Sequence, residues 1–393
     1  MLPQLFKKLQ TKLEEVLDDS PGSASAPLVG SHAPPISSSQ VPSARDVYRY
    51  RMQRGVNLGS WFTLEDWLTP SLFQKASGSK SSEMDLVKGM DASAAREMLE
   101  KHWMNFFNEG DWQWMVAHGV NTVRIPVSYY HFLPGVPDHA DLMKGTEYEK
   151  YAEVYKNSWE FFLSAVQTAG AHQIGVLVDL HAAPGAQNND NHSGLSTGHA
   201  GLWDSSKFQK RTIEILVAMT RDVSRFENVV GIELINEPKN NNRLQSWYDE
   251  AISAIHGAGL DIPMYISDSW DTGHYSGYVE NALNRGSFLV LDHHLYRCFT
   301  SDDQRKTAHD HAREVNPGNP GGGSTAMLAK ASQTTSRSLV IGEWSAALNP
   351  ASLHTYGSDQ EKLAAQREWG HSQWEAYEKF CAGYFFWTLK KEG

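Results

Sequence analysis

Eight short hydrophobic segments, separated by helical patterns, constrain the fold of this chain more than any other feature. They have the length and the β-branched content of buried strands. The segments are residues 55–59, 122–127, 175–180, 229–235, 264–267, 288–295, 339–343 and 384–389. The clearest helical stretches are residues 93–107, 160–173, 205–226, 243–259 and 360–380. Hydrophobic strands that alternate with amphipathic helices predict a parallel sheet covered by helices.

Eight such units predict an α/β protein and, within that class, a closed (β/α)₈ TIM barrel. The alternative is an open doubly wound sheet, but no glycine-rich phosphate-binding sequence follows the first segment. The sequence ends at Gly393, directly after the eighth segment. We therefore expect the eighth outer helix to be missing at the C-terminus. Either the chain is a fragment or an N-terminal helix takes that place.

The first 46 residues differ in composition from the rest of the chain. Residues 1–19 have leucines near helical spacing, interrupted by Lys and Glu, which predicts a short amphipathic helix. Residues 20–46 are rich in Ser, Pro, Ala and Gly, which is typical of a linker. The barrel domain is expected to span residues 47–393.

Charge and targeting signals narrow the range of partners and compartments. A net charge of −11 argues against binding to nucleic acid. Neither a signal peptide nor a run of about 20 apolar residues is evident, so we expect no membrane span and a cytoplasmic monomer. Secretion by an unrecognised route is the alternative, with which the sequon at Asn191 is compatible. Two cysteines allow one disulfide at most, which disfavours a disulfide-held scaffold.

Polar or aromatic residues stand at the ends of nearly all the predicted strands. They are Asn57, Arg124, His181, Glu237, Asp268, His294, Glu343 and Trp387. The carboxyl ends of barrel strands meet at one face, where active sites of this fold are built. We therefore expect these side chains to surround one site.

Glu237 and Glu343 are the most informative of these residues. A glutamate at the end of a buried strand is costly to desolvate unless it has a partner or a function. Glycoside hydrolysis requires two such groups, one acid for the leaving oxygen and one carboxylate to attack or to activate water. The alternative is that each is a structural carboxylate paired with an arginine or with the backbone.

A metal site is not expected, although histidine is the commonest metal ligand. The sequence contains neither an H-E-x-x-H motif on a helix nor a cluster of cysteines and histidines. We predict no metal and no other cofactor.

Seven segments together carry a resemblance to a known family. They are RGVNLGSWFTLEDWLTPSLF, NTVRIPVSYYHF, VLVDLHAAPGAQNNDNHSG, IELINEP, LDHHLYRCF, VIGEWS and FFWTLK. Over residues 51–390 they resemble glycoside hydrolase family 5, and most of all its fungal glucan 1,3-β-glucosidase (exo-β-1,3-glucanase) branch. The resemblance implies a (β/α)₈ barrel, retention of anomeric configuration, no cofactor, and a role in glucan metabolism and cell wall organization.

The resemblance also implies roles for individual residues. Glu237 matches the family acid/base and Glu343 its nucleophile. In a retaining site the two carboxyl groups stand about 5–5.5 Å apart. We expect an ionised Glu343 to raise the pKa of Glu237 and so keep the acid protonated.

Five further positions match family residues near the reacting sugar. Arg124 matches the arginine that keeps the nucleophile ionised and oriented, with a structural salt bridge as the alternative. Asn236 matches the residue that bonds the substrate 2-hydroxyl, with a turn-forming role before a proline as the alternative. The remaining matches, at the glycone site, are His181, His294 and Tyr296.

Four outer positions complete the predicted site. Glu65 matches an acidic residue that grips the terminal glucose and favours exo cleavage, although a loop carboxylate is more often solvated. Trp387 matches the aromatic floor of the subsite that holds the glucose. Trp270 and Phe299 are candidates for an outer platform on the aglycone side, with core packing as the competing explanation.

The sequence departs from the family branch near Asp190, where a second aromatic residue faces the Phe299 position in relatives. The stretch GAQNNDNHSG contains none. The predicted function is a retaining β-glucoside hydrolase that releases glucose from non-reducing ends of β-1,3-glucans by double displacement. The alternatives are a similar enzyme for a glycolipid, flavonoid glycoside or mannan, or a catalytically silent carbohydrate-binding protein.

Overall fold

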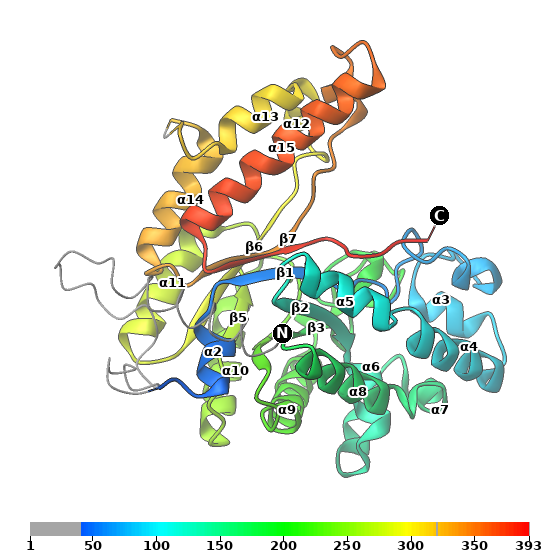
Figure 1. Ribbon diagram of the computed structural model, residues 1–393. Coiled ribbons are helices and arrows are strands. Elements are labelled where there is room, and N and C mark those ends of the chain that lie inside the picture. Colours follow the sequence, from blue (N-terminus) through cyan, green and yellow to red (C-terminus); the bar gives the residue numbers. More distant parts are fainter. Residues whose placement is uncertain (1–40, 320, 393) are drawn as a thin grey trace.

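Eight parallel strands close into a barrel in the order of the chain, β1 to β8 (Figure 1). The computed structural model describes residues 41–319 and 321–392. The strands are β1 Gln53–Asn57, β2 Thr122–Ser128, β3 Gly175–Ala182, β4 Val229–Glu233, β5 Met264–Ser267, β6 Leu289–Leu295, β7 Leu339–Trp344 and β8 Gly383–Phe386. Each of the eight predicted segments overlaps one strand, so the predicted (β/α)₈ barrel is confirmed.

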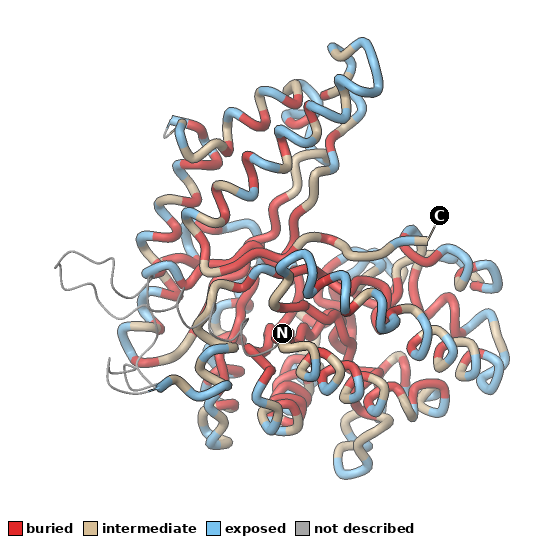
Figure 2. Tube along the Cα trace, in the orientation of Figure 1, coloured by how far each residue is buried: buried red, intermediate tan, exposed pale blue. Residues whose placement is uncertain are grey.

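Helices fill the connections between the strands. They are α2 Ala44–Tyr50, α3 Glu83–Lys88, α4 Ala92–Asn105, α5 Glu109–Ala117, α6 Tyr129–Phe132, α7 Ala152–Tyr155, α8 Ser158–Ala171, α9 Ser206–Val223, α10 Leu244–Gly257, α11 Thr272–Asn284, α12 Ser301–Arg305, α13 Ala308–Val315, α14 Gly323–Thr334 and α15 Asp359–Phe380. The five predicted helical stretches fall on α4, α8, α9, α10 and α15. Each of these helices has a buried side and an exposed side (Figure 2), as expected of helices that cover a core.

The interior of the barrel is layered because every second residue of a strand points inward. On β3, Leu177, Asp179 and His181 follow this spacing from the lower end of the barrel to its mouth. The lowest layer is an apolar cluster drawn from six strands: Leu177, Val230, Tyr265, Val290, Val340 and Phe385. Charged and amide side chains form the next layer, and the predicted site lies above them.

The polar layer depends on a glycine in β7. A Cβ added to Gly342 would lie 2.1 Å from Oδ2 of Asp292, a distance that no side chain can occupy. The backbone N–H of Gly342 instead donates to Asp292 Oδ1 at 2.6 Å. The absent side chain therefore lets a β6 carboxylate lie against the β7 backbone.

Helices α12 to α15 project from one side of the barrel. The first three lie between β6 and β7, and the 22-residue α15 lies between β7 and β8. Figure 1 shows α12, α13 and α15 side by side, rising away from the strands. Ser358 begins α15 with a capping box, in which its side chain accepts from the backbone N–H of Glu361 and the Glu361 side chain accepts in return.

Both ends of the chain bear on the predicted domain organisation. The predicted helix at residues 1–19 and most of the linker lie outside the described residues. Helix α2 begins at Ala44, so regular structure starts within the last three residues of that predicted linker. Residues 387–392, which follow β8, contain no helix and cross to α5, where Lys390 Nζ pairs with Asp111 Oδ2 at 2.7 Å.

Within the described part, no helix combines the length and apolarity needed to cross a membrane.

Candidate active site

A cavity of about 1630 Å³ opens at the carboxyl ends of the strands. Nine of the eleven predicted site residues line it: Glu65, His181, Glu237, Trp270, His294, Tyr296, Phe299, Glu343 and Trp387. The other two, Arg124 and Asn236, are fully buried and are not among the lining residues. The structure thus gathers residues from seven separate chain segments at the face where the fold predicts a site.

Glu237 reaches this cavity through an unusual backbone conformation after β4. Its φ is +42°, in the left-handed region that a side chain rarely adopts. Asn188 holds this turn, because its Nδ2 donates to the carbonyl oxygen of Glu237 at 2.9 Å. Backbone conformations of this kind are maintained where the surrounding structure fixes them, often at functional sites.

His294 lies between the two predicted carboxylates. Its Nδ1 is 2.7 Å from Oε1 of Glu237 and 3.6 Å from Oε2 of Glu343. One oxygen of each carboxylate and a ring nitrogen of His294 all lie within 4.8 Å of one another. The register of β6 against β7 shifts between His293 and His294, and such irregularities re-aim side chains at the rims of barrels.

Two donors hold the carboxylate of Glu343 from other sides. Arg124 NH1 donates to Oε1 at 3.1 Å, and the Tyr296 hydroxyl donates to Oε2 at 2.7 Å. Charge-assisted bonds of this kind favour the ionised carboxylate and fix its orientation. Each oxygen of Glu343 therefore has a donor of its own.

Arg124 connects the site to the polar layer of the barrel. Its Nε lies 2.7 Å from Glu233 Oε2, and its NH2 lies 3.1 Å from Asp179 Oδ2. The same NH2 donates to Asn236 Oδ1 at 2.8 Å. Asn236 in turn has its Nδ2 3.4 Å from His181 Nε2. Arg124 thus ties three acidic residues and two amides, those of Asn57 and Asn236, into one buried network below the cavity.

The pKa values of the two glutamates differ in the direction opposite to the prediction. Burial tends to raise the pKa of Glu237, but the hydrogen bond and the charge of His294 outweigh it and lower the pKa to about 2. Burial raises the pKa of Glu343 to about 7, against the opposing charges of His294 and Arg124. The expectation that Glu343 would raise the pKa of Glu237 is therefore wrong for this ligand-free arrangement. Sequence reasoning did not foresee that the imidazole would contact the predicted acid.

Aromatic and acidic side chains form the inner wall of the cavity. The Trp387 and His181 rings are stacked, with centroids 6.0 Å apart and an interplanar angle of 7°. Trp67, which the sequence argument did not single out, donates from Nε1 to Glu65 Oε2 at 2.7 Å. Burial raises the pKa of Glu65 to about 7. The wall therefore offers a flat ring and a carboxyl group, the features that bind a sugar face and its hydroxyls.

The outer part of the cavity is apolar and open. Trp270 is 57% exposed and Phe299 is 75% exposed, so neither is a core residue, and core packing is excluded as their role. The opposite rim comes from the projecting helices and contains Lys306, Met327, Leu363, Gln366, Arg367 and Gly370. Sequence reasoning missed this rim because the helical spacing of 363, 366, 367 and 370 indicates one helix face but not what that face covers.

His192 is another lining residue that sequence reasoning missed. It lies in the short 3-10 helix Asn191–Ser193, within the stretch GAQNNDNHSG, where we expected a departure from the family pattern. Its Nε2 lies 3.4 Å from Glu237 Oε2. The departure from the family pattern at this stretch was visible in the sequence, but the contact with Glu237 was not.

Two groups of described residues could in principle hold a cation. Their ligand atoms lie within 4.8 Å of one another, and the groups are Glu237–His294–Glu343 and Glu233–Asp292–His294. The guanidinium of Arg124 already neutralises Glu233 and Glu343 by direct contact. A second positive charge would have to compete with it at close range.

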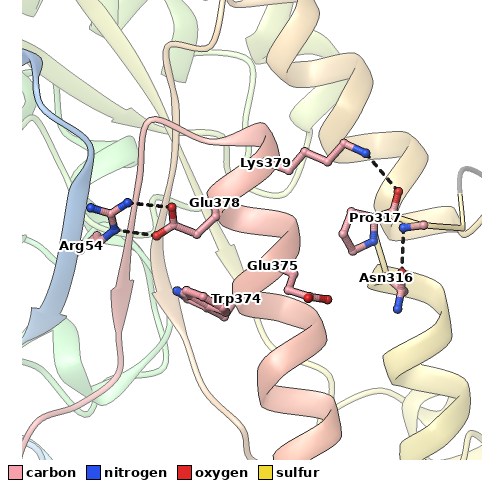
Figure 3. Close-up of a pocket in the computed structure, with 8 residues that line it drawn as sticks. Arg54, Asn316, Pro317, Trp374, Glu375, Glu378 and Lys379 are labelled. Atoms are coloured by element: carbon pink, nitrogen blue, oxygen red, sulfur yellow. Dashed lines mark hydrogen bonds and ion pairs between the residues drawn. The ribbon is translucent and has the colours of Figure 1, made fainter. Parts of the chain in front are cut away.

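A second cavity, of about 900 Å³, is lined by later turns of α15, at Trp374, Glu375, Glu378 and Lys379 (Figure 3). Arg54 and Glu378 form a two-point ion pair there, at 2.7 and 2.9 Å. Lys379 Nζ donates to the Pro317 carbonyl at 3.2 Å. None of the predicted site residues lines this cavity, and these charged groups are engaged with other parts of the protein.

The barrel and its facing carboxylates define a class of enzyme. Two carboxyl groups at this separation, above the strand ends of a (β/α)₈ barrel, are the arrangement of a retaining glycoside hydrolase.

Comparisons with known proteins agree with this class. Residues 85–393 match the family described as Cellulase (glycosyl hydrolase family 5). The chain is 36% identical over 354 residues to glucan 1,3-beta-glucosidase 3 of Schizosaccharomyces pombe, covering 88% of this chain and 70% of the relative. It is 28% identical to a probable glucan 1,3-beta-glucosidase A of Aspergillus clavatus, covering 88% of this chain and 84% of the relative.

A solved structure shares the fold. The rutinosidase from Aspergillus niger superposes with a TM-score of 0.68 at 19% identity, over 88% of this chain and 92% of that one. The chain belongs to glycosyl hydrolase family 5 and is an O-glycosyl hydrolase, as predicted. Its family, relatives and facing carboxylates support a retaining β-glucoside hydrolase.

Proposed function

We propose that this protein releases glucose from the non-reducing ends of β-1,3-glucans or related β-glucosides, with Glu343 as nucleophile and Glu237 as acid/base. One observation carries the proposal: the two carboxylates face one cavity within 4.8 Å of each other, yet are held by different donors. So close an approach is typical of a retaining site, because the carboxyl groups of an inverting site stand about 6.5–9.5 Å apart.

In the first step, Glu343 attacks the anomeric carbon as the bond to the leaving oxygen breaks. Arg124 and Tyr296 keep the attacking carboxylate oriented through bonds at 3.1 and 2.7 Å. Glu237 gives a proton to the departing oxygen. The products are a glucosyl ester on Glu343 and a free alcohol or shortened glucan.

In the second step, Glu237 acts as the base. Esterification removes the negative charge of Glu343, so the ionised form of Glu237 is no longer opposed by its neighbour. Glu237 then takes a proton from water, which attacks the anomeric carbon and releases glucose with its original configuration.

The choice of glucose and of exo cleavage rests on supporting evidence of two kinds. Two of the relatives are named as glucan 1,3-beta-glucosidases. Glu65, bonded by Trp67 at 2.7 Å, lies on the cavity wall where it can accept hydrogen bonds from the hydroxyls of a terminal sugar. A wall of this kind closes the cavity beyond the last sugar and favours removal of single glucose units.

A second candidate differs in the group attached to glucose. The outer cavity carries Trp270 and Phe299 on one side and residues of α14 and α15 on the other, while the Asp190 stretch lacks an aromatic residue. This arrangement favours a β-glucoside with an apolar aglycone over a clamped second glucose. A panel of laminari-oligosaccharides, alkyl glucosides and aryl glucosides separates the two candidates by their kcat/KM values.

The roles of the two glutamates are tested by single substitutions. Glu343→Ala and Glu237→Ala should each lower turnover of an aryl β-glucoside by orders of magnitude while leaving the circular dichroism spectrum unchanged. With an activated leaving group, azide should rescue Glu237→Ala and give a β-glucosyl azide, because the ester on Glu343 still forms. Near-normal turnover by either variant, or an α-azide product, would contradict the assignment.

A further inference from the structure

The two oxygens of the Glu237 carboxylate face two different imidazoles. Oε1 lies 2.7 Å from His294 Nδ1, and Oε2 lies 3.4 Å from His192 Nε2. His294 also contacts Glu343, with Nδ1 3.6 Å from Oε2, and so belongs with the pair of carboxylates described above. The second, His192, lines the cavity and has no role in the steps described above.

The two imidazoles differ in their access to solvent. The side chain of His294 is 2% exposed, and its second nitrogen faces the buried carboxylate of Asp292 at 3.4 Å. The side chain of His192 is 19% exposed. A proton can therefore pass between bulk water and Glu237 through His192, whereas the far nitrogen of His294 faces the interior of the barrel.

Asn188 sets the position of His192 relative to Glu237. The Asn188 Oδ1 accepts from the backbone N–H of Asp190 at 2.9 Å, which orients the amide. Its Nδ2 donates to the Glu237 carbonyl at 2.9 Å and lies 3.0 Å from His192 Nε2. One buried amide thus holds both the backbone of the proposed acid and the ring beside it.

This geometry gives Nε2 of His192 a partner in each protonation state. A neutral imidazole accepts a hydrogen bond at Nε2 from the Asn188 amide, 3.0 Å away. A protonated imidazole has the carboxylate of Glu237 as its counter-charge, with Nε2 3.4 Å from Oε2. Because Asn188 faces the neutral form of Nε2 and Glu237 faces the protonated form, the nitrogen can gain and lose a proton with little movement of the ring.

We propose that His192 is a proton-transfer residue that supplies a proton to Oε2 of Glu237 before the first step and takes one back in the second step. The inference rests on the proposed function, because it takes Glu237 to be the acid/base. His192 does not touch the anomeric carbon in this scheme, and it acts through Glu237.

The proton balance closes over one catalytic cycle. Before the first step, imidazolium gives its Nε2 proton to Oε2 of Glu237 and becomes neutral. Glu237 passes this proton to the leaving oxygen as the glycosidic bond breaks and the ester bond to Glu343 forms. In the second step Glu237 takes a proton from the attacking water and returns it to Nε2, and no oxidant or further reactant is needed.

The charges around His192 fit this exchange. Ionisable groups that face its part of the cavity are Glu65, His181, Asp190, Glu237 and His294. Against the effect of burial, the hydrogen bond and charge of His294 lower the pKa of Glu237, so this carboxyl must receive a proton before it can act as an acid. His181 lies 5.3 Å away between ring centroids, and burial lowers its pKa to about 4, so it adds no positive charge near neutrality.

The test compares His192→Phe and His192→Gly with wild type on aryl β-glucosides of graded leaving-group acidity. Poor leaving groups such as phenol need the proton, so His192→Phe should lose about tenfold to a hundredfold in kcat/KM. The 2,4-dinitrophenyl glucoside needs none and should lose less than about threefold. Imidazole added to His192→Gly should restore activity on the phenyl substrate alone.

His199→Phe is the matched control, because this histidine follows in the same β3–α9 connection, is 68% exposed and pairs with Asp204 outside the cavity. It should behave as wild type. Equal losses by His192→Phe on all leaving groups, or absence of imidazole rescue, would overturn the proposal and leave only a packing role. If wild type cleaves no aryl β-glucoside, the proposed function itself fails and this inference fails with it.

Discussion

The hydroxyl of Tyr296 is a direct probe of the Glu343 carboxylate. It donates to Oε2 at 2.7 Å, a distance of good hydrogen-bond geometry. Burial raises the pKa of Tyr296 well above its ordinary value, so the hydroxyl remains a donor over the whole working range of pH. Replacement by phenylalanine removes this one donor and keeps the ring that packs against Phe299.

The size of the effect follows from the strength of that bond. A hydrogen bond to a charged group contributes about 1.5–3 kcal/mol, which at 1.36 kcal/mol per pKa unit is about one to two units. The pKa of Glu343 is about 7, and Glu343 must be ionised to attack. In Tyr296→Phe the pKa should rise to about 8–9, so kcat/KM should fall below a correspondingly higher pH. At pH 6 the loss should be about tenfold to a hundredfold, and it should shrink above pH 9.

The assay is the pH dependence of kcat/KM for 2,4-dinitrophenyl β-glucoside. Its leaving group needs no proton, so the profile reports the nucleophile without interference from the acid. Tyr278→Phe is the matched control, because that hydroxyl donates to the Asp249 carboxylate at 2.9 Å on the outer helices. The reasoning would be refuted if kcat/KM of Tyr296→Phe fell off at the same acidic pH as that of wild type and was reduced by the same factor at every pH.

Further predictions concern stability and the outer cavity. Arg124→Met leaves buried carboxylates without a positive partner and should lower the free energy of unfolding by about 3–5 kcal/mol in urea titrations. Gly342→Ala would place a methyl group 2.1 Å from Asp292 Oδ2 and should cost about 1–3 kcal/mol or more by the same measurement. The pKa of Glu65 is raised from its ordinary 4.5 to about 7, so the stability it contributes is full below pH 4.5 and is lost as pH rises through 7. Glu65→Gln should therefore raise stability at pH 8 by up to about 3 kcal/mol, and no gain relative to pH 4 would contradict this. Phe299→Ala should raise KM for aryl glucosides several-fold with little change in kcat, whereas an unchanged KM would exclude contact with the aglycone.

The barrel could be predicted from the sequence because its strands are short, hydrophobic and regularly spaced. The strand β5, predicted at residues 264–267, begins and ends where expected. The predicted and observed ends of a strand differ most at β8, which ends at Phe386 although the hydrophobic run continues into the segment that crosses to α5. Hydrophobic pattern locates a strand, but pairing with neighbours decides where it stops.

The site could be predicted as a set of residues but not as a set of contacts. Strand-end positions placed Glu237, His294 and Glu343 at one face, as the structure also has them. The position of His294 relative to Glu343 includes a one-residue register shift between β6 and β7, which no pattern in the sequence reports. For the same reason the order of the two pKa values could not be derived from residue types alone.

The buried carboxylates of Asp179 and Asp292, which we did not single out, could have been predicted from the sequence. Asp179 precedes His181 by two residues, and Asp292 precedes His294 by two, so both carboxylates share the inward face of their strands. A period of two in polar residues within hydrophobic strands indicates a buried charged layer. No sequence pattern indicated which residues form the outer rim of the cavity, because that rim depends on how the projecting helices pack against the barrel.

Helix α15 joins two distant parts of the molecule. Leu363, Arg367 and Gly370 stand at the mouth of the large cavity, and Trp374 and Glu378 stand at the second one. At 1.5 Å per residue, the 15 residues from Leu363 to Glu378 span about 22 Å of continuous helix. Helix α15 is held both by the Arg54 ion pair near its C-terminal end and by packing against α13. A substitution near Glu378 that tilts this helix would therefore also move Leu363 and Arg367 at the mouth of the large cavity.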